Sequence, residues 1–217
     1  MKLKKKVTAH ALVLGSMMLS AAAVHAAHDS GTGACDQLPG QAALKAALTT
    51  ARQAANGGFN LDMWGTIVNR DGIVCAVAFT GADRGSQWPG SRVISAQKAN
   101  TANAFSLPGL ALSTANLWAA VQPGGSLFGL QHSNPVDTGN AYQGPSSNFG
   151  QSNDPLVGQK IGGVNVFGGG LALYNSAHVL IGGIGVSGDS SCADHTLSKN
   201  TSACGGTCLW RAAISST

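Results

Sequence analysis

The chain has 217 residues, the length of one ordinary domain, and a formal net charge of +4. Four of its 13 basic residues lie within positions 2–6, so the other nine balance the nine aspartates, and glutamate is absent. Such a neutral body argues against a nucleic-acid partner and against a polybasic protein of membrane surfaces. The 44% hydrophobic content and the 30 glycines indicate a globular chain with many tight turns rather than a disordered one.

The first 26 residues have the pattern of a secretory signal peptide. Four lysines lie within positions 2–6, an apolar run covers 11–23, and Val24-His25-Ala26 forms a small-x-small cleavage pattern. The apolar run is too short to span a bilayer, which argues against the alternative of an uncleaved anchor. We predict cleavage after Ala26 and a periplasmic or secreted mature chain with no membrane span.

Five cysteines remain after this cleavage, and an exported location permits disulfides. Cys75 lies in an apolar run, which predicts a buried neutral thiol. Cys35 and Cys192 lie in glycine- and serine-rich segments that suit a bridge. Cys204 and Cys208 have the spacing of a metal half-site, but no second pair of ligands completes a zinc centre. We therefore predict a disulfide between Cys35 and Cys192, or one that uses the Cys204/Cys208 pair.

The mature chain begins with a flexible lead-in at 27–40, followed by leucines and alanines at helical spacing that end at Gly57. Two apolar runs, 63–68 and 73–79, predict strands. The Asp71-Gly72 pair between them is typical of a tight hairpin turn. The first part of the domain is therefore expected to be a helix and a β-hairpin.

A glycine-rich turn at 80–90 precedes a second predicted helix. Ser91 is placed to cap this helix, which runs to about Phe105. Residues 110–121 give a third helical stretch. The next segment, 122–164, has no sustained period, and an irregular loop of that length is usually functional or disordered.

The last part of the domain again contains strands. Residues 168–174 and 179–186 predict a second hairpin, and a short helix follows from Cys192 to about Asn200. Residues 201–217 form an irregular tail. Hairpins separated by helices predict an α+β fold, with an antiparallel sheet and helices packed on it, rather than a doubly wound one.

Two residues of the second helix are unusual for the face on which they lie. Lys98 and Thr101 fall on one stripe with Ile94 and Phe105, and burying an ammonium group without a partner is costly. One interpretation is a lysine whose stem packs while its head reaches solvent. The other is a lysine that lines a pocket and meets an anionic ligand.

The mature chain carries four histidines, and His28 and His178 are expected at the surface. His132 lies in an apolar-edged loop that is suited to cover a flat hydrophobic ligand and present an imidazole to its metal. His195 follows Asp194 at the start of the last helix. For each of these histidines a structural, hydrogen-bonded role is the alternative. The chain lacks a nucleophile elbow, a Walker A loop, H-E-x-x-H, a pair of catalytic carboxylates and the C-x-x-C-H motif of covalent haem attachment.

Three groups of segments carry a resemblance to a known family. They are Ile67–Gly72 with Gly81–Arg84, then Ser95–Ala102, and finally Gly168–Leu171 with Ile181–Gly188 and Ala193-Asp194. Together they resemble the GlcG/HbpS-like haem-binding family (DUF336) over residues 41–200. The loop 122–164 is longer than in typical members, and the tail after Asn200 departs from their amphipathic helix.

The resemblance implies a profilin-like fold, a homo-oligomer and noncovalent binding of haem or a related tetrapyrrole. In some members haem binding is linked to haem degradation or redox sensing. Lys98 and Arg84 are the cations nearest the matched motifs, so they are candidate partners of the haem propionates. Thr101 and Asp194 complete the candidate ligand-binding set. For the iron we favour His132, ahead of His195 and Tyr142.

The leading hypothesis is thus an exported protein for haem binding, transport or sensing, with slow haem degradation as a further option. One alternative is an enzyme that acts on a small organic substrate in a pocket lined by Lys98, Arg84 and Asp194. The other is a non-catalytic structural subunit. The residues leave open whether the protein is an enzyme.

Overall fold

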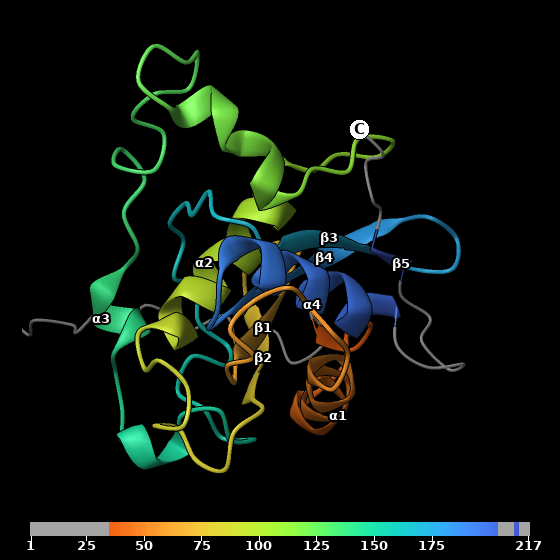
Figure 1. Ribbon diagram of the computed structural model, residues 1–217, viewed down its shortest axis with the longest axis vertical. Helices are drawn as coiled ribbons and strands as arrows, with labels where there is room; N and C mark the ends of the chain where they lie inside the picture. The colour runs from red at the N-terminus through yellow and green to blue at the C-terminus, as the bar shows by residue number, and fades with distance from the viewer. Residues whose placement is uncertain (1–34, 204–210, 213–217) are drawn as a thin grey trace, which may run out of the picture.

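The computed structural model describes residues 35–203 and 211–212 (Figure 1), so the predicted signal peptide, Cys204 and Cys208 lie outside the described residues. In chain order the helices and strands are α1 (Gln41–Arg52), β1 (Trp64–Asn69), β2 (Val74–Phe79), α2 (Ser91–Phe105), η2 (Thr114–Leu117), η3 (Ala119–Val121), α3 (Thr138–Ala141), η4 (Ser146–Asn148), β3 (Gly170–Tyr174), β4 (Leu180–Ser187), α4 (Ser191–Ala203) and β5 (Arg211–Ala212). Among residues 35–203, no helix has the length and hydropathy that a membrane span requires.

The strands form one antiparallel sheet in the order β2-β1-β4-β3-β5. Two hairpins, β1–β2 and β3–β4, pair side by side through β1 and β4. The first hairpin turns at the predicted Asp71-Gly72 position, where the side chain of Asn69 accepts the backbone N–H of Asp71 at 3.0 Å and that of Ile73 at 2.9 Å. Gly72 has a φ of +75°, which glycine adopts without strain. The predicted α+β class with an antiparallel sheet is therefore confirmed.

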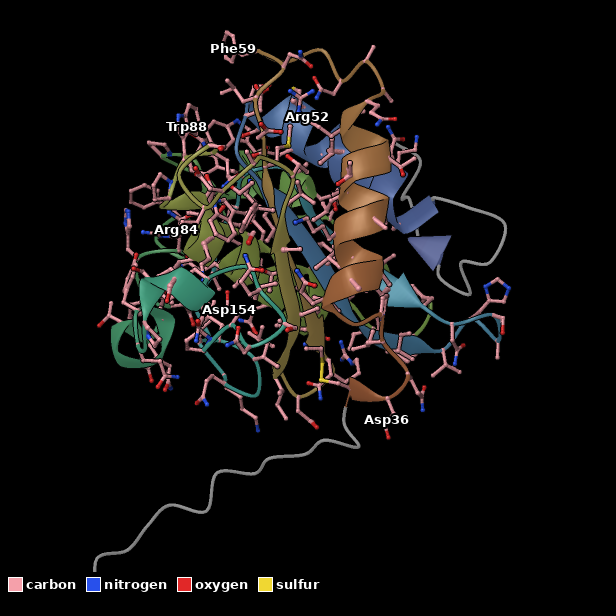
Figure 2. The ribbon with its side chains drawn as sticks, turned by 90° about the horizontal axis from the view of Figure 1, so that it is seen from below. Asp36, Arg52, Phe59, Arg84, Trp88 and Asp154 are labelled. Carbon is pink, nitrogen blue, oxygen red and sulfur yellow. A yellow bond between two sulfur atoms is a disulfide. The ribbon has the colours of Figure 1, made fainter. Side chains whose placement is uncertain are left out.

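Helices cover both faces of this sheet. The side chains of a strand point alternately to its two faces, so that each strand contacts helices on both sides. On β1, Gly65 leaves room for Leu48 of α1, and Ile67 belongs to the apolar cluster of α1 and α4. On the opposite face, the hydroxyl of Thr66 lies 2.7 Å from that of Ser95 on α2. Figure 2 shows the strands between α1 on one side and α2 with the α3 segment on the other.

Helix α2 lies against β4 at backbone distance. A Cβ atom added to Gly185 would lie 2.0 Å from the carbonyl oxygen of Ser95, and one added to Gly183 would lie 2.5 Å from that of Ala99. Neither position has space for any other residue. The glycines of the Ile181–Gly188 segment thus allow the central helix to pack directly on the sheet.

The segment between α2 and β3 differs in part from its prediction. Residues 110–121 form two short 3₁₀ helices, η2 and η3, instead of one continuous helix. One reason is tertiary: Thr114, the first residue of η2, accepts the backbone N–H of Gly170 at 2.9 Å, which ties this segment to β3. In Figure 1 η2, η3 and the following loop project away from α1.

The long loop 122–164 is predominantly irregular, as predicted, and contains α3 and η4. Its centre is fixed to α2 by an ion pair between the fully buried side chains of Arg92 and Asp154. The Asp154 carboxylate also accepts the backbone N–H of Gly150 at 2.6 Å and of Leu156 at 2.8 Å. One buried carboxylate therefore organises the loop without regular secondary structure.

Ser91 does not cap α2 as predicted. It is the first helical residue, the N-cap position belongs to Gly90, and no side chain caps the helix there. The reason is the packing of Ser91 on the sheet, where its hydroxyl lies 3.3 Å from that of Ser187 on β4.

The predicted disulfide of Cys35 is wrong in its partner. Cys35 is bonded to Cys75 with a Cα–Cα distance of 5.6 Å, whereas Cys192 is free and exposed. Cys75 lies in β2 as expected but is only half-buried, on the face that packs against Leu38 and α1. Because residues 35–40 lie against this same face, Cys35 is brought to the strand, a contact that only the folded chain creates.

We expect the Cys35–Cys75 bond to contribute most of its stabilisation through the unfolded chain. It closes a loop across a sequence separation of 40 residues, for which chain entropy gives roughly 4 kcal/mol. The double variant Cys35→Ser/Cys75→Ala should lose about that much free energy of unfolding in urea denaturation. Cys192→Ser, the matched control, should leave it unchanged. Equal stability of the double variant and the oxidised wild type would contradict the bond.

Candidate functional site

A cavity of about 560 Å³ opens between the first turns of α4, the η2–η3 segment and the residues before β3. We call it the histidine cavity. It is lined by Ala115, Trp118, Val166, Phe167, Gly168, Ser191, Cys192, His195 and Thr196. Its walls combine large apolar side chains with a few polar atoms, the combination typical of small-molecule and cofactor sites.

Two aromatic rings form the apolar part of the histidine cavity. The centroids of Trp118 and Phe167 lie 5.8 Å apart, with ring planes inclined by 32°. Trp118 is 51% exposed and Phe167 is 43% exposed, so both rings present their surfaces to solvent or to a ligand. Neighbouring exposed apolar side chains in a concave wall are typical of ligand-binding grooves.

His195 supplies the imidazole of this cavity. The side chain is half-buried, and its Nδ1 atom is buried without a hydrogen-bond partner among the described residues. Burial lowers the pKa of His195, and the positive charge of Lys199 lowers it further. The ring is therefore held neutral, which is the form that binds metals. A Cβ atom at Gly168 would lie 3.3 Å from that of His195 and 2.4 Å from the Ser191 carbonyl oxygen, so glycine keeps this wall open.

The exposed thiol of Cys192 lies one helical turn before His195 and lines the same cavity. The chain thus presents a free thiol and an imidazole on one face of α4. Within the described residues no three histidine, cysteine or acidic side chains gather as a metal cluster.

Lys98 and Asp194 form a buried ion pair behind this cavity. The Lys98 Nζ donates to Asp194 Oδ2 at 2.8 Å and to the Val186 carbonyl oxygen at 3.1 Å, and only 1% of Lys98 is exposed. The interpretation of a solvated Lys98 head is therefore wrong. The reason is that the glycines of β3 and β4 let α2 sink deep enough for its lysine to reach α4. The ammonium meets an anion, as the other interpretation required, but this anion belongs to the protein.

Burial dominates the ionisation of both partners. Desolvation lowers the pKa of Lys98 although Asp194 opposes the shift. Desolvation likewise raises the pKa of Asp194, opposed by Lys98 and by the backbone N–H groups of Asp189 and Gly188. The N–H of Asp189 donates to Asp194 Oδ1 at 2.9 Å, so the carboxylate is shared between α2 and the loop before α4. The pair therefore fixes the start of α4 and, with it, the position of His195.

Thr101 is buried and fully engaged in structure. Its hydroxyl donates to the Gln97 carbonyl oxygen at 2.8 Å and accepts the backbone N–H of Asn165 at 2.9 Å. It thereby joins α2 to the end of the long loop, two residues before Phe167. Its side chain is not among those that line the histidine cavity.

His132 lies exposed in the long loop and does not line the histidine cavity. The two residues before it connect the loop to a wall of that cavity. Leu130 packs on the cluster of Leu117 and Val166, and the side chain of Gln131 accepts the backbone N–H of Val166 at 3.2 Å. The loop that carries His132 is thus fastened to one wall of the cavity.

Arg84 and Tyr142 line a second cavity of about 580 Å³, which we call the arginine cavity. Its lining residues are Trp64, Asp83, Arg84, Gly85, Pro89, Gly90, Tyr142, Ser146 and Phe149. Neither Lys98 nor Asp194 is among them. The structure therefore brings Asp194 together with Lys98, leaves His195 beside them in the histidine cavity, and separates Arg84 and Tyr142 from all three.

The sequence did not indicate Trp118, Phe167 and Cys192 as site residues. Trp118 lay in a stretch expected to be a plain helix, and Phe167 preceded a glycine run that was read only as the start of a strand. The one signal in the sequence was Gly168, since glycine is used where the backbone approaches another group closely.

Replacing Lys98 by Met should lower the stability of the protein, because a buried carboxylate would be left without its cation. The Asp194 carboxylate would keep its burial and lose its cation, so we expect the free energy of unfolding to fall by about 3–5 kcal/mol. The double variant Lys98→Met/Asp194→Leu should recover much of that loss, because no charge then remains buried. Lys160→Met, at an exposed position, is the control. Urea denaturation of the four proteins measures the effect, and an unchanged Lys98→Met midpoint would contradict it.

Comparison with known proteins adds a family and a set of similar folds. The family model described as "Haem degrading protein HbpS-like" matches residues 38–202. No curated protein matches the chain. Among solved structures, a PduOC–haem complex is 23% identical with a TM-score of 0.49, and covers 74% of this chain and 87% of that chain. The ORFY protein of Klebsiella pneumoniae, assigned to DUF336, is 24% identical with a TM-score of 0.48, at 74% and 86% coverage. HbpS is 17% identical with a TM-score of 0.46, at 75% and 86% coverage.

Proposed function

Because the chain belongs to the HbpS-like family of haem-degrading proteins, we propose that it binds haem noncovalently in the histidine cavity. The observation that carries this proposal is a neutral imidazole, that of His195, in the wall of an aromatic cavity of about 560 Å³. A flat apolar macrocycle with an iron centre matches both the aromatic surface and the nitrogen donor. Haem, when bound, supplies an iron that exchanges electrons and takes small axial ligands.

We propose His195 as the iron ligand in place of His132, which the sequence favoured. His195 lies on a helix whose start is fixed by the Lys98–Asp194 pair, so its imidazole is held in place before a ligand arrives. His132 is exposed on a loop and stays a weaker candidate, as does Tyr142 in the other cavity. Cys192, one turn away, offers sulfur at the same cavity.

The propionates need polar partners different from those that the sequence suggested. The ammonium of Lys98 is already paired with Asp194, and Arg84 lines the other cavity. In the histidine cavity the hydroxyls of Ser191 and Thr196 are the donors at hand. The alternative of an enzyme that uses Lys98, Arg84 and Asp194 together finds no support, since these groups do not line one pocket.

Haemin titration of the purified protein tests the site. His195→Ala should shift the Soret band and weaken haem binding by about tenfold or more, because the iron would lose its protein ligand. His132→Ala should bind like the wild type. His178→Asn is a matched control, since His178 is exposed with a φ of +59°, a backbone conformation that Asn tolerates. If His195→Ala keeps the wild-type spectrum and affinity while His132→Ala or Tyr142→Phe loses them, the assignment fails.

We also propose that the protein works outside the cytoplasm and carries haem for transport or sensing. The signal-peptide pattern of residues 1–26 and the Cys35–Cys75 bond support export, since disulfides persist in oxidising compartments. N-terminal sequencing of the protein recovered from cells should begin at Ala27. Recovery of the protein with residues 1–26 still attached would contradict export by this route. The family resemblance supports a homo-oligomer, which sedimentation analysis would measure.

A further inference from the structure

The arginine cavity shares no lining residue with the histidine cavity, and nothing in the proposed function uses it. It lies where the start of β1, the turn before α2 and the α3–η4 part of the long loop meet. Figure 2 shows Arg84 on the side of the molecule where α3 lies. The long loop 122–164 supplies Tyr142, Ser146 and Phe149 to the lining of this cavity, whose volume is about 580 Å³.

One wall of the arginine cavity is an aromatic ring held from behind. The guanidinium of Arg92 stacks on Phe149 at 3.6 Å from the ring centroid. Arg92 is itself fixed by Asp154 and by the carbonyl oxygen of Ala141 at 2.9 Å, all of them buried. Because one face of Phe149 is covered by Arg92, the ring cannot easily turn away. A preorganised ring loses little conformational entropy when a planar ligand stacks on it.

A second wall is formed by Trp64, whose ring is held by its packing. Trp64 is 1% exposed and meets Phe79 edge to face, with ring centroids 5.1 Å apart. Gly150, with a φ of +77°, permits this packing, since a Cβ atom there would lie 2.9 Å from the indole of Trp64. The Nε1 atom of Trp64 is buried and has no acceptor among the described residues.

Arg84 is the cationic side chain in the lining of this cavity. It is exposed, and no ion pair or hydrogen bond engages it within the described part of the chain. The neighbouring Asp83 also lines the cavity, and its Oδ1 accepts the backbone N–H of Gly85 at 2.7 Å and the hydroxyl of Ser86 at 3.3 Å, which holds this carboxylate in its own turn. Tyr142, 60% exposed, adds a third ring with a phenol group. The free cation thus lies beside three aromatic side chains.

We propose that the arginine cavity is a second binding site, selective for a planar aromatic carboxylate. The ring of such a ligand stacks on Phe149 and Tyr142, where offset aromatic contacts are favourable. Its carboxylate pairs with the guanidinium of Arg84, whose planar fork matches a carboxylate in two parallel hydrogen bonds. A ligand that lacks the carboxylate loses the pairing with Arg84, and a ligand that lacks the ring loses the stacking on Phe149 and Tyr142.

The test uses 2-naphthoate as the probe and isothermal titration calorimetry on the full mature protein. The wild type should bind it, and Arg84→Gln should weaken binding by about tenfold. Lys160→Gln removes the same charge from an exposed position outside the cavity and should have no effect. The neutral isostere 2-naphthamide should bind the wild type more weakly, with an affinity that Arg84→Gln does not change.

A steric variant separates the two cavities. A Cβ atom at Gly90 has no neighbour within 4 Å and the residue has an ordinary φ of −63°, so Gly90→Leu fits the backbone and places an apolar side chain in the lining of the cavity. It should abolish naphthoate binding and leave haem titration unchanged, while His195→Ala should do the reverse. Circular dichroism confirms that each variant is folded. The proposal is overturned if the wild type fails to bind 2-naphthoate at millimolar concentration, if Arg84→Gln binds it equally well, or if His195→Ala rather than Gly90→Leu removes it.

Discussion

The contact on which the rest of the structure depends is the close packing of α2 on the glycines of β3 and β4. A Cβ atom at Gly170 would lie 2.5 Å from the carbonyl oxygen of Lys98, and Gly183 and Gly185 are equally tight. Larger residues at these positions would push the helix outward. At a greater distance the ammonium of Lys98 would no longer reach Val186 and Asp194, and its burial would then lack any compensation. The glycines of β3 and β4 and the lysine of α2 therefore depend on each other: the glycines allow the close packing that gives Lys98 its partners.

The close packing of α2 also determines the geometry of the histidine cavity. The Lys98–Asp194 pair joins the helix on one face of the sheet to the first turn of the helix on the other. His195 is the next residue, and its ring is kept neutral by burial and by the charge of Lys199. A buried ion pair contributes little net stability compared with apolar packing, but it fixes one geometry. In this protein the geometry it fixes is that of an imidazole beside two aromatic rings.

The sequence predicted those features that depend on local pattern. The end of α2 at Phe105, the two hairpins and the α+β class follow from periodicity and turn residues, and the structure confirms them, whereas Ser91 begins this helix instead of capping it. The sequence did not predict the features that depend on tertiary contacts. The partner of Cys35 depends on the path of the lead-in across the sheet, and the breaking of 110–121 into 3₁₀ helices accompanies the contact of Thr114 with β3. The separation of Arg84 from Lys98 likewise appears only when the long loop is folded, because no sequence pattern shows which cavity a turn residue lines.

The central proposal is that haem binds beside His195 and not elsewhere on the chain. Diffraction from crystals of the haem-loaded protein, recorded at the iron absorption edge, tests it most directly. The account predicts an anomalous difference peak for iron within bonding distance of the His195 imidazole, with the macrocycle against Trp118 and Phe167. An iron peak at His132, or one in the cavity of Arg84 and Tyr142, would contradict it.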